Sequence, residues 1–365
     1  MTGPMRVLVV NAGSSSLKLR VLEGTEVTAR QDLASDKDGF DNAVLADFLR
    51  DVRLDAVGHR VVHGGIRFTA PTPLDDDVVK ALRDLTDLAP LHQPKSLAGI
   101  DAVGALLPDV PAVACFDTAF HATLPEAAST YALPLEWRQR WDVRRYGFHG
   151  LSHAYAARRA AEIVGRPAGE LRVVVCHLGA GASLCAVEAG RSVDTTMGFT
   201  PLEGLVMATR SGSVDPGLVL WLQEHAGLTE HEVADTLEHR SGLLGLGGSK
   251  DMRELLDRAG GGVGRARLAI DVYVHRLVAG VAAMTASLGG VDVLVFTGGV
   301  GEHAPAIRQA AAERLAFLGI QVDAALNFSV PSDTEISAAD TPVRTVVVEA
   351  REDLEIVRGV RAVLG

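Results

Sequence analysis

The sequence predicts an α/β protein built from two related domains, and three observations lead to this prediction. Short valine-rich apolar runs alternate with amphipathic stretches long enough to form helices. One hairpin-like pattern occurs near the N-terminus and again near the middle of the chain. A chain of 365 residues also exceeds the size that one hydrophobic core usually serves.

The first strand pair is expected in residues 7–21. Residues 7–10 form a β-branched run, residues 11–16 form a turn with Gly13 and three serines, and polarity then alternates to residue 21. The same pattern recurs at 172–190, around a turn of small residues at 179–183. The repetition indicates duplicated domains, although one repeated pair alone is about as consistent with coincidence.

The rest of the chain continues the alternation of strands and helices. A third unit is predicted as a strand at 293–296, a glycine turn at 297–302 and a helix at 304–317. Further helices are expected at 95–107, 151–164, 271–287 and 353–363. Segment 141–150 interrupts the pattern and is the expected hinge. We therefore expect an N-terminal domain at 1–147 joined by the C-terminal helix 353–365, a second domain at 148–352, and a ligand site in the cleft between them.

Charge and composition argue against several classes of protein. The net charge of -11 argues against a general nucleic-acid or anionic-membrane surface, because such surfaces need clustered Lys and Arg. Three scattered cysteines do not make a disulfide framework. The N-terminus lacks the apolar core of a signal peptide, and the apolar stretch 277–296 is interrupted by polar residues and glycines. We expect a cytoplasmic protein without nucleic-acid or membrane partners.

Gly13 and the serines that follow it could hold a phosphate. Glycine permits the positive φ of an anion-binding turn, serine hydroxyls can donate hydrogen bonds, and Lys18 supplies a nearby positive charge. The chain contains no G-x-x-x-x-G-K-[ST] motif, which excludes a P-loop. An ordinary Ser/Gly hairpin turn is the favoured explanation of this motif taken alone.

Arg60 and Asp117 are candidates for chemistry on a carboxylate or phosphate. Arg60 ends a short apolar segment, and its guanidinium can donate two parallel hydrogen bonds. Asp117 follows the apolar run 113–116, and strand ends deliver side chains into crevices. A carboxylate there can hold a metal or orient a nucleophile. A structural ion pair for Arg60 and a turn-capping role for Asp117 stay open.

Several histidine, arginine and glycine segments complete the candidate set. His149 and His177 each lie near glycine, where an imidazole can reach a ligand, although a buried structural histidine is commoner. Arg210 lies in a turn of small residues, and 250–253 is a further cationic segment. Glycines within 298–301 lie between a strand and a helix and could take part of a nucleotide. The 12 histidines include no H-E-x-x-H pair, so a zinc site has little support.

The order of these motifs resembles the acetate kinase family over residues 7–352. The matching stretches are 10–18, 59–65, 88–92, 116–121, 145–153, 177–183, 194–212, 250–253 and 296–302. The resemblance implies the actin/sugar-kinase/Hsp70 (ASKHA) fold, with two duplicated ribonuclease H-like domains, and a homodimer. It also implies reversible, Mg2+-dependent transfer of phosphate from ATP to acetate, giving acetyl phosphate and ADP, with Mn2+ as an alternative metal.

The resemblance implies roles for individual residues. Asp117 is the expected catalytic acid, Arg60 and Arg210 the transition-state arginines, and His149 lies beside the transferred group. The acyl and metal residues would be Arg60, Val62, Leu91, Phe148 and Pro201 for acetate, and Asn11 and Glu352 for the metal. The ATP site would contain Ser14, Ser16, Lys18, His177, Gly179, Gly181, Asp251, Met252, Arg253, Gly299, Val300 and Gly301.

Some positions depart from the family pattern. Ala180 stands where the family has Asn, and Ser213 and His303 replace Asp and Asn. Losing the amide at 180 removes a polar group directed at the phosphates, which would lower turnover or change the phosphate donor. A propionate or butyrate kinase of the same fold, and a nucleotide-binding relative with reduced activity, are the alternative functions. A carboxylate is already nucleophilic, so we expect direct in-line transfer.

Overall fold

The computed structural model describes residues 5–13, 16–36, 39–86, 93–329 and 333–365. The chain divides into two compact units. Unit 1 comprises Met1–Ala122, Phe148–Tyr155 and Arg351–Gly365, and unit 2 comprises Thr123–Gly147 and Ala156–Ala350. This division differs from the predicted domains in three segments: 123–147 belongs to unit 2, whereas 148–155 and 351–352 belong to unit 1. Segment 123–147 bonds within unit 2: the Thr123 hydroxyl donates to the Ser192 carbonyl at 2.8 Å, and Tyr146 N–H to the Gly198 carbonyl at 3.1 Å.

Unit 1 contains a mixed seven-stranded sheet of order β4-β3-β2-β1-β5-β7-β6. Strands β1, β2 and β3 form an antiparallel meander, whereas β1, β5 and β7 are parallel. The strands are β1 (Arg6–Ala12), β2 (Ser16–Glu23), β3 (Glu26–Asp36), β4 (Gly39–Phe40), β5 (Ala56–Val61), β6 (Thr72–Pro73) and β7 (Ala112–Phe116).

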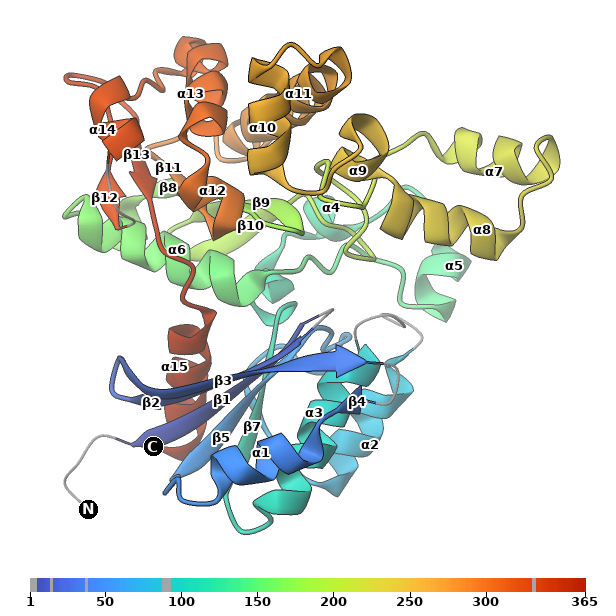
Figure 1. Cartoon of the computed structure of the whole chain (residues 1–365), viewed down its shortest axis with the longest axis vertical. Helices are drawn as coiled ribbons and strands as arrows, with labels where there is room; N and C mark the ends of the chain where they lie inside the picture. Colours follow the sequence, from blue (N-terminus) through green and yellow to red (C-terminus); the bar gives the residue numbers. More distant parts are fainter. Residues whose placement is uncertain (1–4, 14–15, 37–38, 87–92, 330–332) are drawn as a thin grey trace. The chain divides into compact units, whose positions relative to one another are not determined.

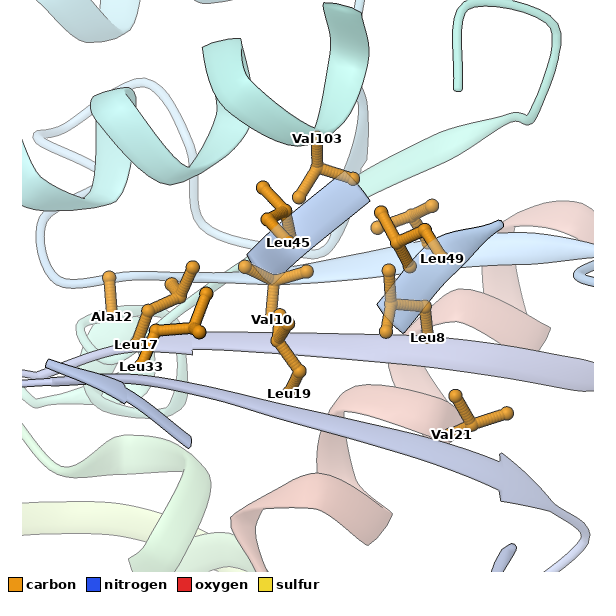
Figure 2. Close-up of a cluster of buried hydrophobic side chains, with 11 residues drawn as sticks. Leu8, Val10, Ala12, Leu17, Leu19, Val21, Leu33, Leu45, Leu49 and Val103 are labelled. Atoms are coloured by element: carbon orange, nitrogen blue, oxygen red, sulfur yellow. The ribbon is translucent and has the colours of Figure 1, made fainter. Parts of the chain in front are cut away.

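Both faces of this sheet are covered, which explains the nearly continuous apolar run of β1. Alternate side chains of a strand point to opposite faces. Leu8 and Val10 pack under α1 (Asn42–Leu49) and α3 (Gln93–Leu106), where they meet Leu45, Leu49 and Val103 (Figure 2). Val7 and Val9 pack on the other side with Ile356 and Val360 of α15 (Glu352–Leu364). The C-terminal helix, red in Figure 1, is therefore part of unit 1 beside the blue N-terminal strands.

Unit 2 repeats the sheet of unit 1. Its six strands have the order β10-β9-β8-β11-β13-β12, so β8 corresponds to β1, β11 to β5 and β13 to β7. The antiparallel and parallel pairings match strand by strand. The strands are β8 (Arg172–Leu178), β9 (Ala182–Glu188), β10 (Arg191–Thr195), β11 (Val293–Thr297), β12 (Thr334–Glu335) and β13 (Arg344–Val347). The repeated hairpin pattern thus reflects a duplicated α/β topology rather than coincidence.

Helices cover the sheets at most of the predicted positions. The remaining helices are α2 (Asp76–Asp84), α4 (Glu126–Ser129), α5 (Leu135–Arg140), α6 (Gly150–Ile163), α7 (Pro216–Glu224), α8 (Glu230–Asp235), α9 (Gly242–Gly247), α10 (Met252–Gly260), α11 (Gly264–Ser287), α12 (Gly298–His303), α13 (Pro305–Arg314) and α14 (Ala324–Ser329). The helix expected at 304–317 is shorter in the structure. It ends at Arg314 as α13, and a 3-10 turn follows at Ala316–Leu318.

Among the described residues, α11 is the one helix long and apolar enough to cross a membrane by length and composition. It is a core helix of unit 2. Tyr273 and Leu277 are buried in it, and a Cβ at Gly280 would come within 2.6 Å of the Leu184 side chain of β9. Such close packing against a sheet is typical of a helix in a soluble α/β domain.

Candidate active site

Three polar side chains lie at one edge of the unit 1 sheet. Asn11 is near the end of β1, Arg60 is near the end of β5, and Asp117 directly follows β7. The register of the parallel strands pairs Asn11 with Arg60 and Arg60 with Cys115, two residues before Asp117. Parallel strands end at the same edge, so the topology brings together residues that are far apart in sequence.

Hydrogen bonds join these three residues to Glu352, the first residue of α15. Arg60 Nε donates to Asp117 Oδ1 at 2.9 Å, and Arg60 Nη2 donates to Oδ2 at 2.6 Å. Arg60 Nη1 donates to Asn11 Oδ1 at 3.0 Å, and Asn11 Nδ2 donates to Glu352 Oε2 at 3.0 Å. The ion pair that the sequence left open for Arg60 is therefore formed with Asp117. A guanidinium has five N–H groups. These bonds use three of them, so each terminal nitrogen of Arg60 has one further N–H that can donate to an oxyanion.

The surroundings of this cluster shift the pKa of both Asp117 and Arg60. Asp117 is 1% exposed, and this burial raises the pKa of its carboxyl while the Arg60 guanidinium opposes the rise. Burial also disfavours the Arg60 cation, but Asp117 and Glu352 outweigh it and raise the pKa of Arg60, which stays charged. Interactions between such charges are weakly screened.

The cluster suits a hard divalent cation. Arg60 is the one cation of the cluster, and it lies beside the carboxylates of Asp117 and Glu352 and the amide oxygen of Asn11. The cluster therefore has more negative than positive charge and several oxygen atoms that could bind a metal. The described part of the chain contains no group of three or more His, Cys, Asp or Glu side chains that could hold a metal. Mg2+ commonly takes only one or two carboxylates and completes its shell with phosphate oxygens and water. The oxygens of Asn11 and Glu352 are of the kind that Mg2+ prefers.

The turn Phe148–Gly150 is held against Asp117. Gly150 N–H donates to the Asp117 carbonyl at 2.9 Å, and a Cβ at Gly150 would lie 2.2 Å from that oxygen, so this position requires glycine. The His149 N–H donates to the Asp117 carboxylate, which lowers the pKa of this carboxyl against the effect of burial. His149 adopts φ 58°, a strained conformation that clusters at functional sites. His121 was assigned no role from the sequence, yet its Nε2 lies 3.0 Å from the Phe148 carbonyl.

Three histidines of unit 1 are buried in their neutral form. Burial lowers the pKa of His59 to about 3 and the pKa of His63 and His121 to about 4. Their side chains have a mainly structural environment: they are 2%, 0% and 1% exposed. The folded state disfavours the protonated form of these imidazoles, so the stability of the protein depends on pH.

We expect the free energy of unfolding to fall as pH decreases from about 6.5 towards 4. In the unfolded chain these imidazoles have their ordinary pKa of 6.5, so below this pH the unfolded state binds more protons than the folded state. Each histidine should lower stability by about 2 kcal/mol between pH 7 and pH 5. Urea unfolding between pH 7.5 and 4.5 measures the slope. His59→Leu should reduce it, the exposed His231→Gln should not, and a slope that His59→Leu leaves unchanged would contradict the assignment.

In unit 2 the β8–β9 turn has the small-residue character expected of a phosphate loop. His177 lies near the end of β8, and Gly179 N–H donates to the Gly181 carbonyl at 2.9 Å. The Ala180 carbonyl accepts a hydrogen bond from Ala208 N–H at 3.1 Å. Ala180, which departs from the family pattern, is thus hydrogen-bonded through its main chain to the loop that carries Arg210.

The other predicted nucleotide residues lie at helix N-termini. Asp251 caps α10, because its carboxylate accepts from Arg253 N–H at 2.8 Å and Glu254 N–H at 3.1 Å. Met252 is buried, whereas Arg253 is exposed. Gly299 is the second residue of α12, which follows β11 directly, and a Cβ at Gly299 would meet no atom within 4 Å. Gly299 therefore offers open backbone to a ligand.

The structure distributes the predicted site residues over both units. Unit 1 holds Asn11, Ser16, Lys18, Arg60, Val62, Asp117, Phe148, His149 and Glu352. Unit 2 holds His177, Gly179, Gly181, Pro201, Arg210, Asp251, Met252, Arg253, Gly299, Val300 and Gly301. Ser14 and Leu91 lie outside the described residues. Within unit 2, Arg210 Nη1 donates to the Pro201 carbonyl at 3.0 Å, which joins two predicted residues directly.

Two α/β units of one topology, with charged residues at the strand ends, define the class of duplicated ASKHA-type folds. The model of the acetokinase family matches residues 43–358, and the chain belongs to this family. The acetate kinase of Thermoanaerobacterium thermosaccharolyticum is 42% identical over 390 aligned residues, covering 97% of this chain and 98% of that protein.

Solved structures agree with this assignment. The acetate kinase of Porphyromonas gingivalis superposes with a TM-score of 0.88 at 36% identity, covering 99% of this chain and 100% of that one. A propionate kinase from Francisella tularensis gives a TM-score of 0.88 at 35% identity, covering 97% and 98%. Family membership implies ATP as a substrate and a divalent metal as a cofactor.

Proposed function

We propose that the protein transfers the terminal phosphate of ATP to acetate, reversibly, giving acetyl phosphate and ADP. The observation that carries this proposal is the hydrogen-bonded Asn11–Arg60–Asp117 cluster at the strand ends of unit 1, in which Asp117 is buried. A carboxylate needs no deprotonation before it attacks phosphorus, so the site must align two anions and neutralise their charge. A guanidinium with spare N–H groups beside a cation site is suited to this task.

Each charged residue has a defined part in this mechanism. Asp117 fixes the plane of Arg60 through two parallel hydrogen bonds, so the two remaining terminal N–H groups of Arg60 have a set direction. These groups hold oxygens of the acetate or of the transferring phosphoryl group. Arg210 is proposed to supply further positive charge, and His149 a further hydrogen-bond donor. Mg2+, or Mn2+ in its place, held by Asn11 and Glu352 would neutralise phosphate charge.

The ATP residues complete the proposal. Ser14, Ser16, Lys18, His177, Gly179 and Gly181 bind the phosphates, and Asp251, Met252, Arg253, Gly299, Val300 and Gly301 bind the adenosine. The buried Met252 contributes by supporting the helix start rather than by an exposed contact. The exposed Arg253 and the open backbone at Gly299 can reach a ligand directly.

Hydroxamate trapping of the acyl phosphate tests the function. With ATP and Mg2+, acetate should give acetyl hydroxamate and an equal amount of ADP, and propionate should give less. ATP without a carboxylate is the control, because a nucleotide-binding relative would release ADP equally in both cases. ADP release that does not depend on acetate would contradict the proposal, and a preference for butyrate would favour the alternative acyl kinase.

Substrate length should be set by Val62. The side chain follows β5 two residues after Arg60, is 5% exposed and is stiff because it is β-branched. The other residues proposed to bind the acyl group are Phe148, Leu91 and Pro201. Val62→Ala should lower KM for propionate and butyrate and leave KM for acetate nearly unchanged, because one methylene typically changes the discrimination between substrates by about 1–3 kcal/mol. The measurement is kcat/KM for the three acids in both proteins, and an unchanged ratio would show that Val62 does not limit the length of the acid.

We further propose that the protein is a cytoplasmic homodimer that uses α7. All nine residues of α7 are described, and none is buried, although most are apolar. Leu218, Leu220 and Trp221 are 45%, 58% and 51% exposed. An apolar helix without a buried face is typical of an interface. Light scattering should give a dimer mass for the wild type and a monomer mass for Leu220→Glu, and a monomeric wild type would refute the proposal.

A further inference from the structure

A cluster of three side chains in unit 2 lies outside every residue assigned so far. Tyr131 Oη donates to Glu203 Oε2 at 2.5 Å, and Arg145 Nη2 donates to Glu203 Oε1 at 2.8 Å. The Arg145 guanidinium also lies 5.5 Å from the centre of the Tyr131 ring. All three belong to unit 2, and the Glu203 carboxylate joins them.

The cluster closes around the backbone of residues 196–199. Arg145 Nη1 donates to the carbonyls of Thr196 and Met197, both at 3.1 Å. The Tyr131 hydroxyl accepts a hydrogen bond from Phe199 N–H at 2.9 Å while it donates to Glu203. The side chains of Arg145 and Tyr131 thus bond three backbone groups of this loop, which a loop without regular structure otherwise leaves to water.

Gly198 lies at the centre and admits no side chain. A Cβ there would come 1.8 Å from Glu203 Oε2 and 2.1 Å from Tyr131 Oη. The Gly198 carbonyl accepts from Tyr146 N–H at 3.1 Å and Gly147 N–H at 3.3 Å. The glycine therefore lets the loop press directly against segment 145–147, the residues immediately before Phe148 and His149.

The loop leads to the arginine of the proposed site. Pro201 follows Phe199 by two residues, and its carbonyl accepts the hydrogen bond from Arg210 Nη1 at 3.0 Å. The far end of the loop is closed by Ser213, whose hydroxyl accepts from Gly204 N–H at 3.1 Å and whose N–H donates to the Gly204 carbonyl at 3.0 Å. The position of the Pro201 carbonyl, and with it the direction of Arg210, depends on how the loop is fixed.

We propose that Tyr131, Arg145 and Glu203 are positioning residues that fix loop 196–203 and thereby orient Arg210 for phosphoryl transfer. The proposal rests on the proposed function in its catalytic consequence, but its structural consequence is independent of activity. Displacement of a catalytic group by about 1 Å can cost about 100-fold in rate. The cluster therefore should affect kcat without taking part in the chemistry.

Three conservative variants test this role. Tyr131→Phe removes one hydroxyl, Glu203→Gln removes the charge, and Arg145→Lys keeps the charge but loses the planar fork that serves three acceptors. We expect each variant to lower kcat for acetate by about 10- to 100-fold with KM for ATP changed less than about threefold. The double variant Tyr131→Phe/Glu203→Gln should lose little more than Glu203→Gln alone, because both act through one carboxylate.

The matched control is Asp292→Asn in the same unit. Asp292 also accepts three hydrogen bonds from one arginine, Arg172, at 2.9, 3.1 and 3.1 Å, but at the start of β8 and β11. The Asp292→Asn variant should leave kcat for acetate unchanged. Amide hydrogen exchange of segment 196–213 is the second readout, and it should accelerate in Glu203→Gln and not in Asp292→Asn.

The outcomes separate the two proposals. A wild type without acetate-dependent turnover would refute the proposed function, whereas the exchange data would still show whether the cluster fixes the loop. Unchanged exchange in Glu203→Gln would overturn the cluster's role. Faster exchange with normal kcat would overturn the link to Arg210, as would a loss confined to KM for ATP.

Discussion

Asp117→Asn is expected to reduce acetyl phosphate formation by about 1,000-fold or more while the protein stays folded. Asparagine keeps the shape of the side chain but loses the charge that holds Arg60 through two hydrogen bonds at 2.9 and 2.6 Å. It also removes negative charge from the cation site formed with Asn11 and Glu352. Loss of one preorganised charged group in a buried site commonly costs about 100- to 1,000-fold, and this substitution disturbs two functions at once.

The control for this variant is Asp101→Asn. Asp101 of α3 likewise accepts two hydrogen bonds from one arginine, Arg83 of α2, at 2.7 and 2.8 Å, but this pair is exposed. Hydroxamate trapping gives the rate, and circular dichroism confirms that both variants fold. Turnover of a folded Asp117→Asn protein close to that of Asp101→Asn would refute the assignment.

Arg60→Ala and Arg210→Ala should each lower kcat by at least about two orders of magnitude and change KM for ATP much less. Such a pattern marks groups that act mainly on the transition state. Arg60→Ala has a second expected effect, because it leaves Asp117 buried without its partner. Breaking a buried ion pair in this way costs about 3–5 kcal/mol of stability.

Steady-state kinetics and urea unfolding of the two arginine variants measure both effects. The double variant Arg60→Ala/Asp117→Asn should recover part of the stability lost in Arg60→Ala, because the unpaired buried charge is gone. It should recover none of the activity. A change confined to KM for ATP would show that these arginines bind nucleotide instead of stabilising transfer.

The sequence predicts the strands well because their apolar runs are continuous. Residues 7–10 and 173–176 are buried on both faces of a sheet, and such runs are easy to recognise. Asp117 and Arg60 were found as separate candidates at strand ends, but their pairing depends on the β5–β7 register, which no local pattern contains. The predicted boundary differs from the division of the units because segment 123–147 joins unit 2 through bonds to backbone carbonyls and to Glu203, and no local sequence pattern contains these long-range contacts.

The start of α11 shows a second limit. The helix was expected from 271 but begins at Gly264. Its first turns carry Arg265 and Arg267, and the side chains that they bury include the small ones of Ala266 and Ala269, which give a weak apolar signal. Likewise, Tyr131, Arg145 and Glu203 received no role from the sequence. Their contacts converge on Gly198, and a glycine needed only for space looks like any other in the sequence.

The matching strand registers allow the two units to be compared position by position. Strands β1 and β8 have the same succession of buried and half-buried residues, which sets Asn11 against His177, and the neighbouring strands set Arg60 against Thr297 and Asp117 against Ala350. Unit 1 thus has the charged Arg60 and Asp117 at positions where unit 2 has the uncharged Thr297 and Ala350. The duplicated topology therefore supplies the same three strand-end positions twice, but only unit 1 has an acid and an arginine at them.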